Sequence, residues 1–240
     1  FVAELLSLVA ERGADIAARE ERIAAQRAGL ERGAGATAAR ASEVPIRAKV
    51  AQGYVGDVLV ERLVRTGDTT QRTEPGVPRG VRRTGRVHPQ SMPVFDRFAP
   101  TLYASLPAGG WALDAGQQEA VDRLREHGVV VERLTDDASG PVAVEVFRVD
   151  SAVRAPRPFQ GHNEVTLGGR WRPSQRVLSA GTFVVPRDQP LVALAAYLLE
   201  PESDDGLATW NVFDPSLRAG GDFPVLRVQG RVAGARRMLP

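Results

Sequence analysis

The residue types that could hold a metal ion or carry nucleophilic catalysis are few in this sequence and widely spaced. The chain of 240 residues has three histidines, His88, His127 and His162, and no cysteine. None of the histidines has a carboxylate or a second imidazole three or four residues away, the spacing that presents two zinc ligands on one helix face. The absence of cysteine excludes disulfides, thiol nucleophiles and iron–sulfur clusters. A Gly-x-Ser-x-Gly elbow and glycine-rich phosphate loops are also missing, so the sequence predicts no catalytic, metal or cofactor site in this chain.

The most promising group of polar side chains is the acidic segment 200–206, which Trp210 follows closely. Clustered carboxylates suit a hard cation such as calcium, or a cationic group of a ligand. The segment lacks the regular Asp-x-Asp-x-Asp spacing of a calcium loop. The candidate binding residues are Glu202, Asp204, Asp205 and Trp210.

A structural role for the same residues is the alternative. Pro201 ends a helix, and Ser203 or Asp204 would then cap the next helix, with Trp210 packed beneath it. Trp210 and Phe213 could form a stacking surface for a ligand, although an aromatic pair three residues apart more often belongs to a core. Both interpretations remain open at the level of sequence.

The balance of charges argues against a nucleic-acid partner. Thirty-one basic residues stand against 29 acidic ones, and Lys49 is the only lysine, a pattern more typical of arginine-biased coding than of an electrostatic binding surface. The one basic run, Arg79–Arg86, has no aromatic residue within it for base stacking, so it predicts a solvated loop rather than a phosphate or RNA site. No apolar run approaches the roughly 20 residues that a membrane-spanning helix needs.

The first half of the chain predicts a long helix followed by β-structure. Val9, Ile16, Ile23 and Leu30 recur at seven-residue intervals within residues 1–32. This stripe is too thin for a coiled coil, so we expect the helix to pack on its own domain, with its first turns buried. Residues 44–50 and 54–64 predict a pair of strands, and residues 66–92 predict a long loop.

The second half predicts an α/β unit followed by a β-rich segment. Residues 101–106 and 129–134 predict strands around a helix at 114–127 that ends at Gly128. Further strands are expected at 142–149, 164–167, 181–185 and 223–228, with a helix from Asp188 to Glu200. The predicted fold class is α+β, with an N-terminal helix, a small α/β unit and a β-rich C-terminal segment with a packed helix. We expect one domain at 1–97, a second at 98–230 and a mobile tail at 231–240.

Three segments of the chain carry a family resemblance: 159–165, 180–191 and 197–207, the last followed by Trp210-Asn211. They resemble the C-terminal part of bacterial zinc metallocarboxypeptidases, which belong to the carboxypeptidase A-like peptidases. Weaker resemblance extends over most of residues 1–228. The family binds zinc with His-x-x-Glu and a distant histidine, and no position of this chain corresponds to those ligands.

The resemblance therefore implies a non-catalytic C-terminal accessory region of such a metallopeptidase. It implies that the region packs on an upstream catalytic domain of the same chain, or shapes access to it. Zinc is expected in the parent protein only, and the parent is expected to be secreted or periplasmic. The chain begins with Phe1 and has no targeting signal, so we expect it to be part of a longer protein. The alternative is a stand-alone module that binds a glycan or peptide through Trp171, Trp210 or the acidic segment.

Overall fold

The computed structural model describes residues 2–32, 42–70, 76–218 and 220–239. The contacts within the chain divide it into two units, one formed by Phe1–Arg47 with Thr101–Pro240 and the other by Ala48–Pro100. The chain thus enters the first unit twice, and the expected domains at 1–97 and 98–230 remain a prediction.

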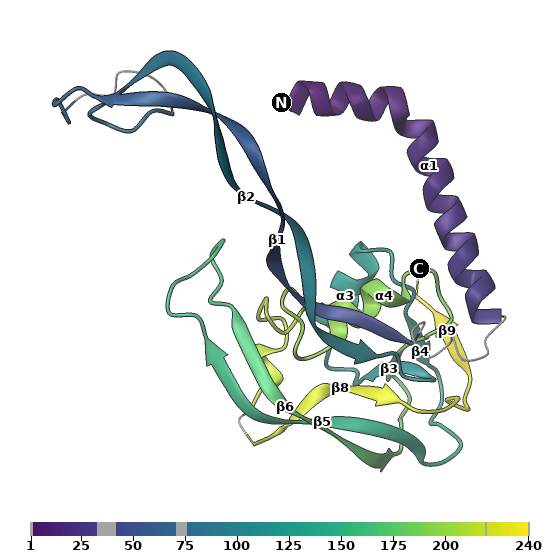
Figure 1. Ribbon diagram of the computed structural model, residues 1–240. Coiled ribbons are helices and arrows are strands. Elements are labelled where there is room, and N and C mark those ends of the chain that lie inside the picture. The colour runs from purple at the N-terminus through teal and green to yellow at the C-terminus, as the bar shows by residue number, and fades with distance from the viewer. Residues whose placement is uncertain (1, 33–41, 71–75, 219, 240) are drawn as a thin grey trace. The chain divides into compact units, whose positions relative to one another are not determined.

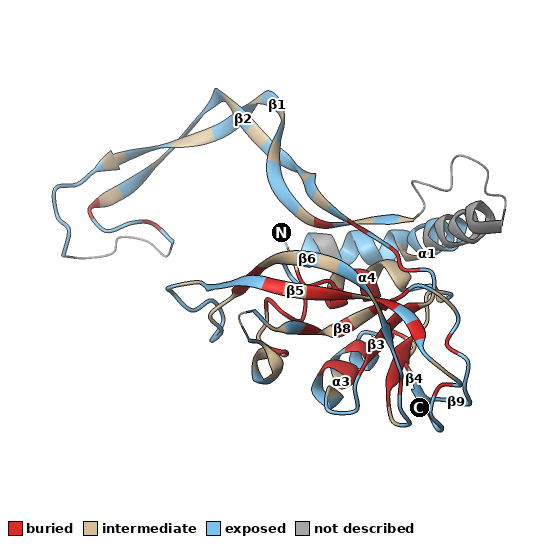
Figure 2. Ribbon diagram, turned by 90° about the horizontal axis from the view of Figure 1, so that it is seen from below, coloured by how far each residue is buried: buried red, intermediate tan, exposed pale blue. Residues whose placement is uncertain are grey.

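The predicted N-terminal helix is confirmed as α1 (Val2–Arg32; Figure 1). Its apolar residues Val2, Leu6 and Leu8 are 65%, 64% and 52% exposed, so the expected burial of the first turns is wrong. Figure 2 colours the ribbon by burial class and shows exposed residues on this helix. The glycines predicted to end the helix, Gly33 and Gly35, lie outside the described residues.

Two long strands, β1 (Glu43–Arg65) and β2 (Val81–Ser105), pair with each other and make up the second unit over most of their length. The predicted pairing of 44–50 with 54–64 is wrong, because both segments belong to the single strand β1. The predicted loop at 66–92 is wrong from Val81 onward. A two-stranded ribbon has no buried face along most of its length, so its sequence lacks the apolar alternation that marks a half-buried strand.

The basic run lies at the start of β2, where two side chains contact β1. The Arg83 Nε atom donates to a carboxylate oxygen of Glu61 at 2.6 Å, and the Thr84 hydroxyl donates to the Arg62 carbonyl at 2.6 Å. This segment is therefore paired strand rather than the loop that its composition indicated.

The first unit contains a seven-stranded antiparallel sheet in the order β6-β5-β8-β3-β7-β4-β9. Two crossovers lie at its centre: β3-α3-β4 passes around β7, and β7-α4-β8 passes around β3. Four strands and two helices in this order form the two interlocked split β-α-β units of a ferredoxin-like pattern. The bounds are β3 Gly110–Leu113, α3 Gln118–Glu126, β4 Glu132–Leu134, β5 Val142–Arg154, β6 Val165–Arg176, β7 Phe183–Val185, α4 Val192–Leu199, the 3-10 turn η1 Asp214–Ser216, β8 Asp222–Val228 and β9 Arg236–Met238.

The core lies on both faces of this sheet because successive residues of a strand point to opposite sides. On one face, α3 and α4 cover the larger side chains of the central strands. This cluster includes Trp111, Leu113, Val121, Leu124, Phe147, Phe183, Val185, Ala195, Leu199, Phe213, Phe223 and Val225. The opposite face carries a smaller cluster that includes Ala112, Leu134, Val144, Val146, Leu178, Val184 and Val228.

The α+β class is therefore compatible with the structure, although the described chain is more β-rich than predicted. β5 and β6 run on well beyond their predicted ends. In addition, residues 231–240, expected to form a mobile tail, include β9, which pairs with β4 through Arg237 opposite Arg133.

Candidate functional site

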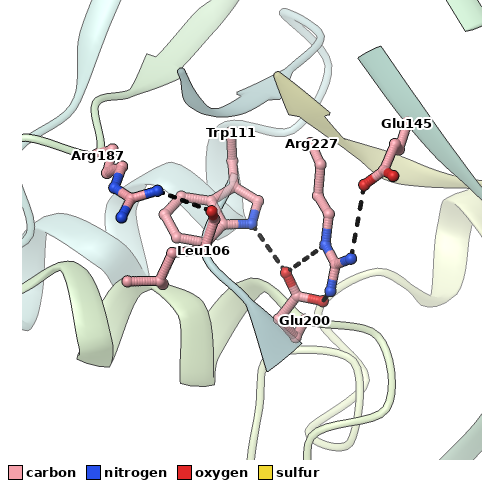
Figure 3. A network of polar contacts seen from close by, with 6 residues as sticks. All are labelled: Leu106, Trp111, Glu145, Arg187, Glu200 and Arg227. Carbon is pink, nitrogen blue, oxygen red and sulfur yellow. Dashed lines mark hydrogen bonds and ion pairs between the residues drawn. The ribbon is translucent and has the colours of Figure 1, made fainter. Parts of the chain in front are cut away.

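A buried ion pair fixes the C-terminal end of α4, where the acidic segment begins. Glu200 is 1% exposed and accepts hydrogen bonds from Arg227, from Nε at 2.9 Å and from Nη2 at 2.6 Å (Figure 3). The indole Nε1 of Trp111 donates to the same carboxylate at 3.1 Å. The guanidinium of Arg227 also lies 3.6 Å from a carboxylate oxygen of Glu145.

The register of the sheet brings these residues together. Arg227 on β8 lies opposite Trp111 on β3 and opposite Glu145 on β5, and residues directly opposite in an antiparallel sheet share a face. The guanidinium also stacks over the ring of Trp171, 4.0 Å from its centre. Burial raises the pKa of Glu200, while its hydrogen bonds from Arg227 act in the opposite direction. Glu200 is therefore held inside the unit, where a ligand does not reach it directly, whereas Trp171 is partly buried beside it.

The acidic segment turns back against the start of β1 after Glu200. The backbone N–H of Asp204 donates to the Ile46 carbonyl at 3.0 Å, and Arg47 Nε donates to the Glu202 carbonyl at 2.7 Å. Burial raises the pKa of the Glu202 carboxyl group, and the positive charge of Arg47 opposes that rise. A Cβ at Gly206 would lie 2.8 Å from the Tyr197 carbonyl, so the turn requires glycine.

Two aspartates of the segment meet aromatic side chains. The Tyr197 hydroxyl donates to Asp204 at 2.6 Å, and the indole N–H of Trp210 donates to Asp205 Oδ1. Burial, together with the hydrogen bond to Asp204, raises the pKa of Tyr197. Both aspartates remain exposed.

Trp210 belongs to a surface cluster of three aromatic rings. Its ring centre lies 5.4 Å from that of His162 and 6.3 Å from that of Phe159. Phe159 is 53% exposed, His162 is exposed, and Trp210 is partly buried. We call Phe159, His162 and Trp210 the aromatic ledge, with Asp205 at its edge.

A tight turn presents two of these rings. Phe159 and His162 exchange backbone hydrogen bonds of 2.8 and 2.9 Å, so their side chains project from the same side. The intervening residues Gln160 and Gly161 have φ angles of 49° and 87°, as in a type I′ turn. Glycine adopts this conformation freely, whereas Gln160 adopts it at a cost, and such strain is most common at functional sites.

Side-chain amides attach this turn to the segment that carries Trp210. Asn163 Nδ2 donates to the Ala155 carbonyl at 2.9 Å, and Asn211 Nδ2 donates to the Asn163 carbonyl at 3.0 Å. Asn211 itself has a φ of 69°, a second left-handed residue beside the ledge. The three rings are therefore held by backbone and amide hydrogen bonds from two segments distant in sequence.

The predicted site residues are only partly brought together. Trp210 contacts Asp205, whereas Asp204 is engaged by Tyr197 and Glu202 is half buried near Arg47. Their role in binding remains a prediction.

Two aromatic residues of the ledge were missed from the sequence, whereas Phe213 is internal and the partly buried Trp171 lies on β6. Phe159 and His162 flank Gln160-Gly161, and this turn pair was the signal that could have identified them. Phe213 is buried in the core, 5.0 Å from Phe223, so it forms no exposed surface with Trp210. Trp171 packs on Phe147 as well as on Arg227.

The residues that the structure describes do not fit the zinc that the family resemblance implies for the parent protein. Among the described residues, no group of three or more histidine, aspartate and glutamate side chains could hold a metal ion. His127 Nδ1 lies 2.8 Å from the Arg123 carbonyl at the end of α3, and His162 lies on the ledge.

Comparisons with known proteins relate part of the chain to carboxypeptidases. The chain is 31% identical to Carboxypeptidase 2 of Trichophyton tonsurans over 136 residues, which are 57% of this chain and 23% of that protein. It is 27% identical to Carboxypeptidase 2 of Trichophyton rubrum over 137 residues, again 57% of this chain and 23% of the relative. The match thus spans less than a quarter of the relatives' length. No family model matches the chain, and no solved structure matches it.

This similarity confirms the predicted relationship to carboxypeptidases at a coarse level, with fungal proteins as the relatives found. Across the part of the chain that the structure describes, no helix has the length and apolar character needed to cross a membrane.

Proposed function

We propose that this chain is a non-catalytic accessory region of a carboxypeptidase-like zinc metallopeptidase. The observation that carries the proposal is the similarity to Carboxypeptidase 2 over 57% of this chain, which amounts to only 23% of the relative. The chain also contains its own seven-stranded sheet with two core clusters, which suits a separately folded region of a larger protein.

In this proposal the region packs on the catalytic domain of the same polypeptide or shapes the path of substrates to it. The zinc and its ligands belong to that catalytic domain, which carries out the hydrolysis. The parent protein is secreted or periplasmic, as the resemblance implies.

The test compares this chain with the full-length product of its gene. Purified separately, each is assayed for bound zinc by mass spectrometry and for release of C-terminal residues from peptides. We expect stoichiometric zinc and carboxypeptidase activity in the full-length protein and neither in this chain. Zinc bound at one equivalent by this chain, together with peptidase activity, would overturn the accessory role.

A second candidate, a binding module for a peptide or glycan, is favoured by the aromatic ledge. Exposed aromatic rings held in place by their neighbours are typical of surfaces on which ligands stack. A binding screen with peptides and oligosaccharides tests this candidate. Binding that is lost in Trp210→Ala and retained in Trp171→Phe would support it, and a screen without any binder would remove it.

A further inference from the structure

The polar groups around the aromatic ledge differ in whether their hydrogen bonds are already made within the protein. The indole N–H of Trp210 is used by Asp205, and the amides of Asn163 and Asn211 donate to backbone carbonyls. These donors are therefore satisfied within the protein. Apart from the exposed imidazole of His162, the polar group that the edge of the ledge offers to a ligand is the carboxylate of Asp205, which can only accept when it is ionised.

The Asp205 carboxylate is the clearest such acceptor. It is exposed, and its Oδ1 atom is held at the indole edge. No arginine or lysine forms an ion pair with it within the described ranges, whereas Asp214, Asp222 and Glu61 are each paired with an arginine. This carboxylate is therefore exposed at the indole edge of Trp210, with no arginine or lysine ion pair among the described residues.

We propose that the aromatic ledge binds the cationic side chain of an arginine or lysine in a peptide. The cation would lie against the exposed surfaces of Phe159 and Trp210, where the ring faces attract positive charge, and would donate to Asp205. Asp204, exposed on the same loop, adds negative charge nearby. The proposal depends on the proposed function only in taking peptides as the source of the cation.

A sugar is the competing ligand for such a surface. It is disfavoured because few hydrogen-bond donors of the protein remain free to bind its oxygen atoms. Sugar hydroxyls both donate and accept, and because the donors of Trp210, Asn163 and Asn211 are already used within the protein, a sugar on this ledge would find few donors besides His162. A guanidinium or ammonium group only donates, which matches an edge that mainly accepts. The cation is therefore the better chemical complement.

The experiment follows the three indole N–H signals of the whole chain by NMR at pH 8, with the signal of Trp210 assigned from Trp210→Phe. The probes are the peptide acetyl-Gly-Arg-Gly-amide, its neutral analogue with citrulline in place of arginine, and the sugar chitohexaose. We expect the arginine peptide to shift the Trp210 signal with a millimolar dissociation constant, and the citrulline peptide to bind about tenfold more weakly.

Two variants locate the contact. Asp205→Asn keeps an oxygen for the Trp210 indole and removes the charge, so we expect roughly fivefold weaker binding of the arginine peptide. Asp150→Asn, on β5, changes a carboxylate that lies 3.6 Å from the guanidinium of Arg170 on β6, and it should leave binding unchanged.

Three results would overturn the proposal: equal affinity for the arginine and citrulline peptides, no effect of Asp205→Asn, or a shift of the Trp210 signal by chitohexaose alone. The last result would assign the ledge to a sugar. None of these outcomes bears on zinc content or peptidase activity, so failure of this inference is distinct from failure of the accessory role.

Discussion

The buried pair of Glu200 and Arg227 gives the sharpest prediction for stability. Glu200→Gln keeps the shape of the side chain and an acceptor for Trp111, but it removes the charge that faces the guanidinium. The side chain of Arg227 is only 10% exposed. Removing one partner of a buried pair costs about 3–5 kcal/mol, because the other charge stays buried without compensation.

The surroundings of Arg227 place the expected cost at the lower end of that range. Its guanidinium keeps the contact with Glu145 at 3.6 Å and the stacking on Trp171. We therefore expect Glu200→Gln to lower the free energy of unfolding by about 3 kcal/mol. At roughly 2–4 °C per kcal/mol for a unit of this size, the melting temperature should fall by about 6–12 °C.

Urea unfolding followed by tryptophan fluorescence is a suitable assay, since Trp111, Trp171 and Trp210 all lie in the first unit. The double variant Glu200→Gln with Arg227→Met should lose about 2 kcal/mol less free energy of unfolding than the two single variants lose in sum. The matched control is Asp222→Asn, which weakens an exposed ion pair with Arg148 and should cost less than about 1 kcal/mol. The reasoning is refuted if Glu200→Gln costs no more than this control, or if the two single effects simply add.

Three further outcomes are expected from local geometry. The pKa of Tyr197 is raised in the folded state, so above pH about 10 the unfolded chain loses this proton more readily than the folded one. The contribution of Tyr197 to the free energy of unfolding is therefore fully present below that pH and is lost as the pH rises further. Urea titrations at pH 9 and 11 should therefore show a smaller loss of stability in Tyr197→Phe than in the unaltered protein, and equal losses would contradict this. Gly161→Ala, at a φ of 87°, should cost about 1 kcal/mol and shift the Trp210 NMR signal, whereas Gly140→Ala, with open space around it, should do neither. Phe213→Ala should cost about 3–5 kcal/mol in urea unfolding, because that ring is fully buried, and a loss below 1 kcal/mol would place it outside the core.

Local patterns in the sequence were sufficient to predict a helix or strand where the pattern lies within that one element. The helix α1, the end of α3 before Gly128 and the strand β8 were predictable because spacing, glycine caps and apolar alternation act within one element. The pairing of β1 with β2 was not predictable in this way. A ribbon that is exposed on both faces carries no burial pattern, so only the partner strand, 20 or more residues away, reveals it.

The candidate site shows the same division. Sequence alone identified an acidic segment next to Trp210 and showed that zinc-ligand spacing was missing, because both depend on residues close together in the chain. Tertiary structure decided which of these side chains face solvent: Glu200 turns inward because the sheet register brings Arg227 to it, whereas Asp205 stays outside on the edge of Trp210. Phe159 and His162 joined Trp210 only through folding, since hydrogen bonds between segments about 50 residues apart hold the three rings together.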